Sequence, residues 1–288
     1  MKPAAFEFTR PSTLAEALEV LAANPDAKVL AGGQSLIPLL SMRVAAPALL
    51  VDINAISELS YVTTDSDGVR VGALARHAEV EADPDARRVQ PLLSRALRMV
   101  AHPTIRNRGT TVGSIVHADA SAEMPVVLSL LGGHVVAASS AGRRTIAAAD
   151  LFLGPLESSL RHGEIAVEAF FPALPIGSGV AFDETARRHG DYALCGVAAV
   201  MGLVDEQVTS VRAGYLSVCE LPTVVDLTAC YADGFTDAAH ASAADLALEH
   251  LEPDDDIHAS AAYRSQLVRT LTKRVVAAAH ADAVSRRN

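Results

Sequence analysis

Residues 30–36 read Leu-Ala-Gly-Gly-Gln-Ser-Leu, and the interpretation of the whole sequence starts from this stretch. Residues 28–30 indicate a short strand, and the apolar residues 36–42 indicate a helical turn after the two glycines. Gly32 and Gly33 carry no Cβ, so their backbone N–H groups can approach the negative charge of a pyrophosphate. An ordinary strand-to-helix turn is the competing interpretation of this stretch taken alone.

Residues 110–114, Thr-Thr-Val-Gly-Ser, combine hydroxyl groups with glycine a second time, and Arg106 and Arg108 precede them. Two such stretches favour an anion cradle for a dinucleotide, although composition alone leaves an ordinary turn equally open. Neither stretch matches the G-x-G-x-x-G pattern of a Rossmann domain or the G-K-[ST] ending of a P-loop. Asp119 and Glu123 suit ribose hydroxyls, while Glu123 also suits the positive end of a helix.

Composition excludes several classes of function. The chain has 288 residues, 50% of them hydrophobic, and a net charge of −10 without a basic stripe, so we expect a compact protein that does not bind nucleic acid. No apolar run is long enough to span a membrane and no signal peptide is evident, which predicts a cytoplasmic protein. The three cysteines form no close pair, and the patterns H-E-x-x-H and G-x-S-x-G are absent. We therefore expect neither a metal site nor a catalytic residue in this chain.

Local patterns predict alternating helices and strands and one linker. Thr13 and Glu16 form a capping box before a helix that ends at Asn24-Pro25. The range Pro172 to Gly179, rich in proline and glycine, predicts a domain boundary. The other elements that we expect are helices over 91–102, 124–131, 239–251 and 263–279, strands over 49–53, 69–73, 134–138, 145–148 and 165–171, and a hairpin over 193–218 with its turn at Asp205-Glu206-Gln207.

Five stretches together resemble one known family. They are residues 30–40, residues 105–114, His117 to Pro125, Gly154-Pro155 and the sequence Gly190-Asp191-Tyr192-Ala193. In content and spacing the chain resembles, over nearly its whole length, the FAD-binding medium subunit of the xanthine dehydrogenase and carbon monoxide dehydrogenase family of molybdenum hydroxylases.

The resemblance implies an α+β fold. Two subdomains of the vanillyl-alcohol oxidase and p-cresol methylhydroxylase type grip FAD, and a C-terminal domain holds a three-stranded antiparallel sheet and a helical bundle. On this chain we expect an FAD-binding domain over residues 1–175, with subdomains over about 1–56 and 57–175, and a C-terminal flavoprotein domain over residues 176–288.

The resemblance also assigns cofactor contacts. The pyrophosphate is held by residues 31–35 and 110–114, Glu123 is an acidic contact, Ile165 lines the flavin site and Tyr192 lies beside the isoalloxazine. Val112 stands where relatives have a glycine, so we expect Gly113 to provide the close approach; Glu123 replaces the commoner Asp, and Glu184 stands near a frequent Lys. The full set of expected FAD contacts is Ala31, Gly32, Gly33, Gln34, Ser35, Leu36, Thr110, Thr111, Val112, Gly113, Ser114, His117, Asp119, Glu123, Ile165 and Tyr192.

The function implied is electron transfer within a larger enzyme. FAD in this chain receives electrons from [2Fe–2S] clusters on a small subunit, which are reduced by a molybdenum cofactor on a large subunit, and passes them to an external acceptor. The resemblance is greatest to hydroxylases of N-heteroaromatic compounds, and it predicts a dimer of heterotrimers. A self-sufficient FAD oxidoreductase of the same fold and an assembly module that has lost its cofactor are the alternatives.

Overall fold

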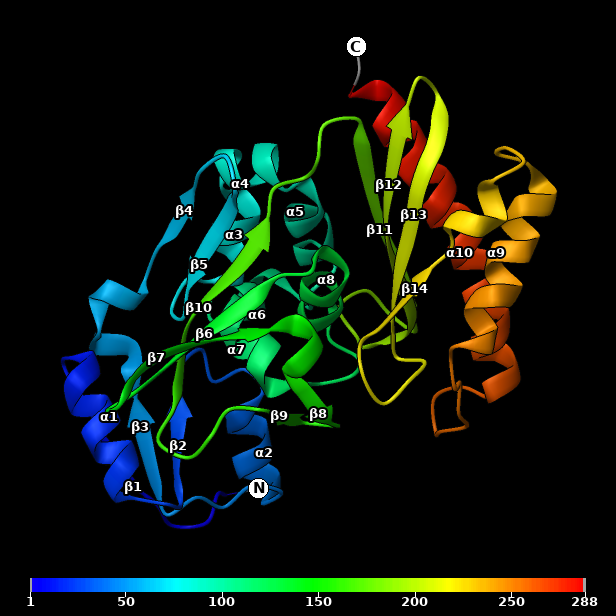
Figure 1. Cartoon of the computed structure of the whole chain (residues 1–288). Helices are drawn as coiled ribbons and strands as arrows, with labels where there is room; N and C mark the ends of the chain where they lie inside the picture. Colours follow the sequence, from blue (N-terminus) through cyan, green and yellow to red (C-terminus); the bar gives the residue numbers. More distant parts are fainter. Residues whose placement is uncertain (1, 287–288) are drawn as a thin grey trace.

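The computed structural model describes residues 2–286 and begins with a small parallel sheet (Figure 1). Its strand order is β1-β3-β2. The side chain of Thr13 accepts a hydrogen bond from the Glu16 N–H at the first helix, which confirms the capping box. The elements of this part are β1 (Glu7–Thr9), α1 (Leu14–Ala23), β2 (Ala27–Leu30), α2 (Leu36–Met42) and β3 (Leu49–Asp52).

The second part is built on a five-stranded sheet with the order β4-β5-β10-β6-β7, whose helices lie mainly on one side. The strands are β4 (Val62–Thr64), β5 (Gly68–Gly72), β6 (His134–Ser139), β7 (Gly142–Ala147) and β10 (Ile165–Pro172), and a small hairpin adds β8 (Phe152–Gly154) and β9 (Glu157–Ser158). The helices are α3 (His77–Ala82), α4 (Pro84–Val89), α5 (Pro91–Leu97), α6 (Pro103–Arg106), α7 (Thr111–His117) and α8 (Glu123–Leu131).

The third part is an antiparallel sheet with two helices on one face. The expected hairpin is confirmed, and its turn residues Asp205 and Glu206 have φ angles of 48° and 67°, as a tight turn with two left-handed residues requires. The three long strands that correspond to the expected three-stranded sheet are joined by a short fourth at the edge. The elements are β11 (Ser178–Ala186), β12 (Ala193–Val204), β13 (Gln207–Leu216), β14 (Thr223–Asp226), α9 (Asp237–Glu249) and α10 (Ala261–Ser285).

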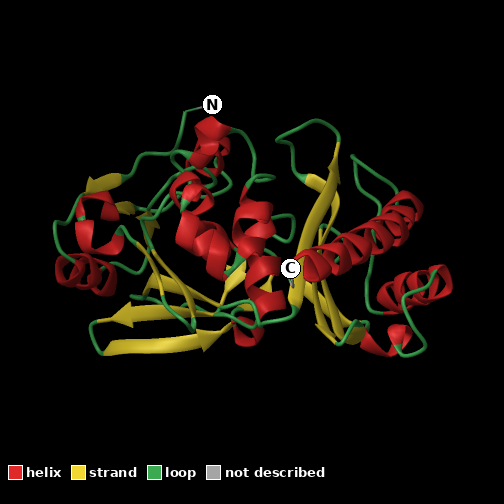
Figure 2. Ribbon diagram, turned by 90° about the horizontal axis from the view of Figure 1, so that it is seen from above, coloured by secondary structure: helices red, strands yellow, loops and turns green. Residues whose placement is uncertain are grey.

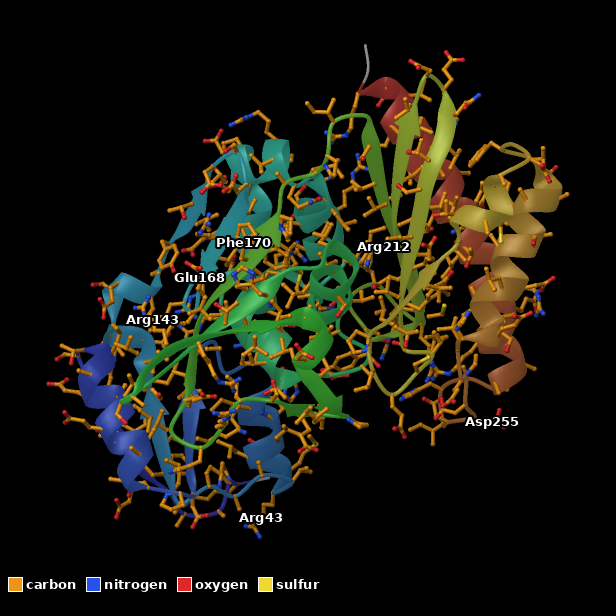
Figure 3. The ribbon with its side chains drawn as sticks, viewed as in Figure 1. Arg43, Arg143, Glu168, Phe170, Arg212 and Asp255 are labelled. Carbon is orange, nitrogen blue, oxygen red and sulfur yellow. The ribbon has the colours of Figure 1, made fainter. Side chains whose placement is uncertain are left out.

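This C-terminal sheet lies between two layers of helices, as Figure 2 shows. Along β12, Val197 and Ala199 pack with α9 and α10, whereas Ala198 belongs to the core shared with the second part. This alternation is the period of two that a strand buried on both faces must have. A Cβ on Gly214 would lie 2.7 Å from a methyl group of Val126, so the glycine lets α8 approach β13 closely. Arg212 on the same strand is labelled in Figure 3.

One helix is shorter than expected. The apolar pattern predicted a helix over 91–102, but α5 ends at Leu97 and a new short helix, α6, begins at Pro103. Ala101 has a φ angle of 44°, which a continuing helix cannot contain. The apolar positions after Leu97, such as Val100, are still buried. Their apolar spacing therefore reflects burial in the core and not a helix.

Candidate functional site

The two glycine-containing stretches meet in space. We call residues 31–35 the first glycine segment and residues 110–114 the second glycine segment. A Cβ on Gly32 would lie 2.8 Å from the Cα of Gly109 and 3.0 Å from the backbone nitrogen of Thr110. Any side chain at position 32 would therefore force the two segments apart. The fold thus joins two segments that are about eighty residues apart in the sequence.

The first glycine segment combines a left-handed glycine with backbone N–H groups that have no acceptor among the described residues. Gly33 has a φ angle of +73°, and its carbonyl accepts a hydrogen bond from Ile37 N–H at 3.0 Å as α2 begins. The Ser35 side chain makes no capping bond to α2. Within residues 2–286, no group accepts a hydrogen bond from the backbone N–H of Gln34 or Ser35. These free donors fit the charge of a pyrophosphate.

The second glycine segment is the start of a helix, not a loop. Thr110 is the N-cap of α7, and its Oγ1 accepts a hydrogen bond from Gly113 N–H at 3.2 Å. A Cβ on Gly113 would lie 2.5 Å from that oxygen, so the glycine makes room for the cap. The N–H of Gly113 thus has an acceptor within the chain, and the close approach of Gly113 to the cofactor stays a prediction.

Two further side chains of the second glycine segment point inward. Thr111 is fully buried, and its Oγ1 lies 3.2 Å from Nδ1 of His77. Val112 is 1% exposed and belongs to the core, so the valine that replaces a family glycine fills packing space. Burial lowers the pKa of His77 to about 4, with a smaller contribution from the charge of Arg106, and the ring is therefore neutral at pH 7.

Gly113, Ser114 and His117 form the half-buried face of α7. Their spacing of one and four residues places them on one side of the helix. The pKa of His117 is lowered, mainly by burial; the charge of Lys28 on β2 adds to this, and Asp119 acts against it. Of the residues expected from α7, Ser114 and His117 have side chains on this half-buried face.

Three carboxylates gather where α8 meets the C-terminal sheet. The Asp119 carboxylate accepts the Ser121 N–H at 2.8 Å, which closes the turn before α8. Burial raises the pKa of Glu123, the first residue of α8, and Asp119 raises it further. Burial also raises the pKa of Glu184 on β11, followed by the charges of Glu123 and Asp183, and Glu184 Oε2 has no hydrogen-bond partner among the described residues. Burial and the neighbouring negative charges therefore favour the protonated form of Glu123 and Glu184.

Tyr192 and Ile165 occupy opposite environments. Tyr192 is 67% exposed, and the pKa of its phenol is raised by desolvation and then by Asp119 and Glu123, which places it beside the acidic group. Gly190, just before it, has a φ angle of +85° and packs against the His102 ring. Ile165 is 2% exposed in the core, so its side chain packs the sheet that supports the site.

Sequence reasoning missed two residues that join the glycine segments. Asn54 Nδ2 donates to the Ala31 carbonyl at 2.9 Å, and Arg76 donates both to Asn54 Oδ1 and to the Arg108 carbonyl at 2.7 Å. Nothing in the local pattern around Asn54 or Arg76 indicates such contacts, because the partners are backbone atoms distant in the chain. His77, which contacts Thr111 Oγ1, carries no local signal of this role either.

Two family descriptions match this chain and together cover most of it. The family described as "FAD binding domain in molybdopterin dehydrogenase" matches residues 4–174, and that described as "CO dehydrogenase flavoprotein C-terminal domain" matches residues 180–279. The chain therefore belongs to the family of FAD-binding medium subunits of molybdenum hydroxylases.

Relatives agree over their whole length. The chain is 42% identical to the 6-hydroxypseudooxynicotine dehydrogenase complex subunit alpha of Paenarthrobacter nicotinovorans, over 97% of this chain and 96% of the relative. It is 38% identical to the nicotine 6-hydroxylase medium subunit of the same organism, over 98% and 99% of the two chains. A chain in the crystal structure of quinoline 2-oxidoreductase from Pseudomonas putida 86 superposes with a TM-score of 0.92 and 38% identity, covering 98% of this chain and 99% of that one.

These matches establish the class of protein and the expected α+β fold. The chain is an FAD-carrying oxidoreductase subunit of a multi-subunit molybdenum hydroxylase. In this family the iron–sulfur clusters and the molybdenum cofactor lie on partner subunits. No helix in residues 2–286 combines the length and apolar character needed to cross a membrane.

Proposed function

We propose that the two glycine segments hold the FAD pyrophosphate and that this subunit relays electrons during hydroxylation of an N-heteroaromatic compound. The observation that carries the proposal is the contact between the two segments at Gly32, in a segment whose Gln34 and Ser35 N–H groups are free of any acceptor within residues 2–286. A substrate with a nitrogen-containing aromatic ring is supported by the nicotine- and quinoline-oxidising enzymes named above.

The residues of this chain would bind and orient the cofactor. In our proposal, the first glycine segment and Leu36 bind the pyrophosphate chiefly through backbone N–H groups, with Ser114 and His117 on the neighbouring face of α7. Asp119 and Glu123 face ribose hydroxyls or the flavin, and Tyr192 shields the isoalloxazine. When bound, the isoalloxazine supplies the redox chemistry, taking electrons from partner [2Fe–2S] clusters and giving them to an external acceptor. No general base in this chain is required.

The proposal extends to organisation and location. We place the domain boundary between residues 175 and 176, at the Pro172 to Gly179 connection, and the boundary between the two FAD-binding subdomains near residue 56. We propose that the complex is a dimer of heterotrimers. Three unpaired cysteines, Cys195, Cys219 and Cys230, fit a reducing compartment such as the cytoplasm.

The test is flavin retention by a Gly33→Val variant in the complete complex. Gly33 has a positive φ, and a Cβ there would lie 3.2 Å from side-chain carbons of both Ile37 and Leu30, so valine must distort the cradle. We expect the wild-type complex to be yellow with FAD, iron and molybdenum, and the variant complex to assemble without FAD. FAD occupancy that is unchanged in an assembled variant would contradict the cradle. Wild-type protein that oxidises substrate without partners would favour a self-sufficient oxidoreductase, and colourless wild-type protein an assembly module.

A further inference from the structure

We infer that Asn54 and Arg76 form a positioning link that sets the spacing of the two glycine segments, and with it the affinity for FAD. The inference rests on the proposed function, because the segments matter only if they hold the cofactor. Asn54 follows β3 in the first part of the chain, and Arg76 precedes α3 in the second. The link therefore joins the first part of the chain to the second.

The link begins behind the first glycine segment. Asn54 Nδ2 donates a hydrogen bond of 2.9 Å to the carbonyl oxygen of Ala31. In a trans peptide the carbonyl and the N–H of the next residue point in opposite directions. Holding the Ala31 carbonyl on the Asn54 side therefore turns the Gly32 N–H to the other side. Asp52 fixes Asn54 in turn, since its Oδ1 accepts the Asn54 backbone N–H at 2.9 Å.

The link ends behind the second glycine segment. One guanidinium nitrogen of Arg76 donates to Asn54 Oδ1 at 2.7 Å, and another donates to the Arg108 carbonyl at 2.7 Å. The residues that follow Arg76 and Arg108 are also hydrogen-bonded to each other, because His77 N–H donates to the Gly109 carbonyl at 2.9 Å. The carbonyl oxygen of Arg108 is also the atom with which a Cβ on Gly32 would clash.

The chemistry of Arg76 suits a spacer. A guanidinium is planar and holds several donors in a rigid fork, so it can fix two acceptors at a set separation, which a single ammonium group cannot. Its acceptors here are neutral, an amide oxygen and a backbone carbonyl, while Glu79 accepts only the backbone N–H of Arg76. The pKa of Arg76 is lowered, mainly by burial, because its guanidinium is half-buried between these two acceptors.

The test compares variants of the deflavinated complex in its full subunit composition, titrated with FAD and followed by flavin fluorescence and by visible circular dichroism of the bound flavin. Arg76→Met removes both donor arms and retains an unbranched chain, and Arg76→Lys retains only the charge. We expect both variants to raise the Kd for FAD about tenfold, which corresponds to loss of one charge-assisted hydrogen bond, and to change the circular dichroism. Arg144→Met is the matched control, because Arg144 likewise joins a side-chain oxygen to a backbone carbonyl, those of Glu164 and Ser159, and its loss should leave both readouts unchanged.

A double variant tests whether the two residues act as one link. Asn54→Ala combined with Arg76→Met should weaken FAD binding no more than the stronger single variant, because either change already breaks the link. Additive losses, or wild-type affinity in Arg76→Lys, would overturn the inference while wild-type binding of FAD upholds the proposed function. A wild-type complex that takes up no FAD would overturn both.

Discussion

The two glycine segments have similar composition and opposite construction. In the first glycine segment the backbone N–H groups of Gln34 and Ser35 are free of any acceptor in residues 2–286, and Ser35 caps nothing. In the second glycine segment Thr110 caps α7 and the side chains of Thr111 and Val112 are buried. The hydroxyl beside the glycine therefore caps a helix in the second segment, whereas in the first it makes no cap. The two segments can be told apart only by identifying the hydrogen-bond partner of each donor and acceptor.

The largest effect that would test this contrast is expected at the contact between the segments. Gly32→Ala places a methyl group against the backbone of Arg108 and Gly109, which cannot move as a flexible side chain could. We expect the purified complex to lose most of its FAD, measured as flavin per polypeptide. Gly154→Ala is the control, since a Cβ there meets only Glu157 side-chain atoms at 3.5 Å or more. Full FAD content in Gly32→Ala would mean that the segments need not touch.

An intermediate effect is expected at the acidic pair beyond the segments. The pKa values of Glu123 and Glu184 are raised in the folded protein, so folding is favoured when both are protonated, and stability falls as pH rises above the ordinary glutamate value of 4.5. Glu184→Gln stays neutral and should melt at a higher temperature than wild type at about pH 9, with the difference shrinking at about pH 5. Charges of Asp119 and Asp183 act in the same direction on this pair.

Thermal melting of the flavin-free protein measured across pH checks this prediction. Glu157→Gln, a change at an exposed hairpin position, should follow the wild-type pH dependence. A parallel pH profile for Glu184→Gln and wild type would show that Glu184 is ionised in the folded chain. Glu184 would then not hold a proton together with Glu123.

The smallest effects are expected at the hydroxyl groups of Thr110 and Ser35, and they distinguish the roles of the two segments. Thr110→Val removes the acceptor of the Gly113 N–H and should lower the stability of the flavin-free protein by about 1 kcal/mol, the usual cost of a lost N-cap. Ser35→Ala should leave that stability unchanged and reduce FAD affinity by a fewfold. Chemical denaturation and FAD titration of both variants provide the two measurements. Equal losses of stability in both variants would contradict the different roles of Thr110 and Ser35 in the fold.

Much of the fold could be predicted from the sequence because its signals are local. The capping box at Thr13, the hairpin turn at Asp205-Glu206 and the helix that ends at Gly132 each depend on a few adjacent residues. Where burial continued without helix, as at Val100, periodicity extended α5 too far. The wrong length arose because helical periodicity and core packing produce the same apolar spacing.

The candidate site was predictable only in part. The residue pattern and the resemblance both pointed to the glycine segments, but the cap that Thr110 gives Gly113 and the burial of the Val112 side chain in the core could not be predicted. Asn54 and Arg76 could not be found, because their partners are main-chain oxygens whose identity no residue type reveals. Long-range contacts to backbone leave no pattern in a single sequence.

The acidic pair has a consequence for how the protein matures. Glu123 stands at the start of a helix that precedes the connection at Pro172 to Gly179, and Glu184 stands on the first strand after it. The two carboxyl groups meet only after the later half of the chain has been synthesised and has docked against α8. The acidic pair is therefore complete only in a chain whose C-terminal sheet has docked against α8.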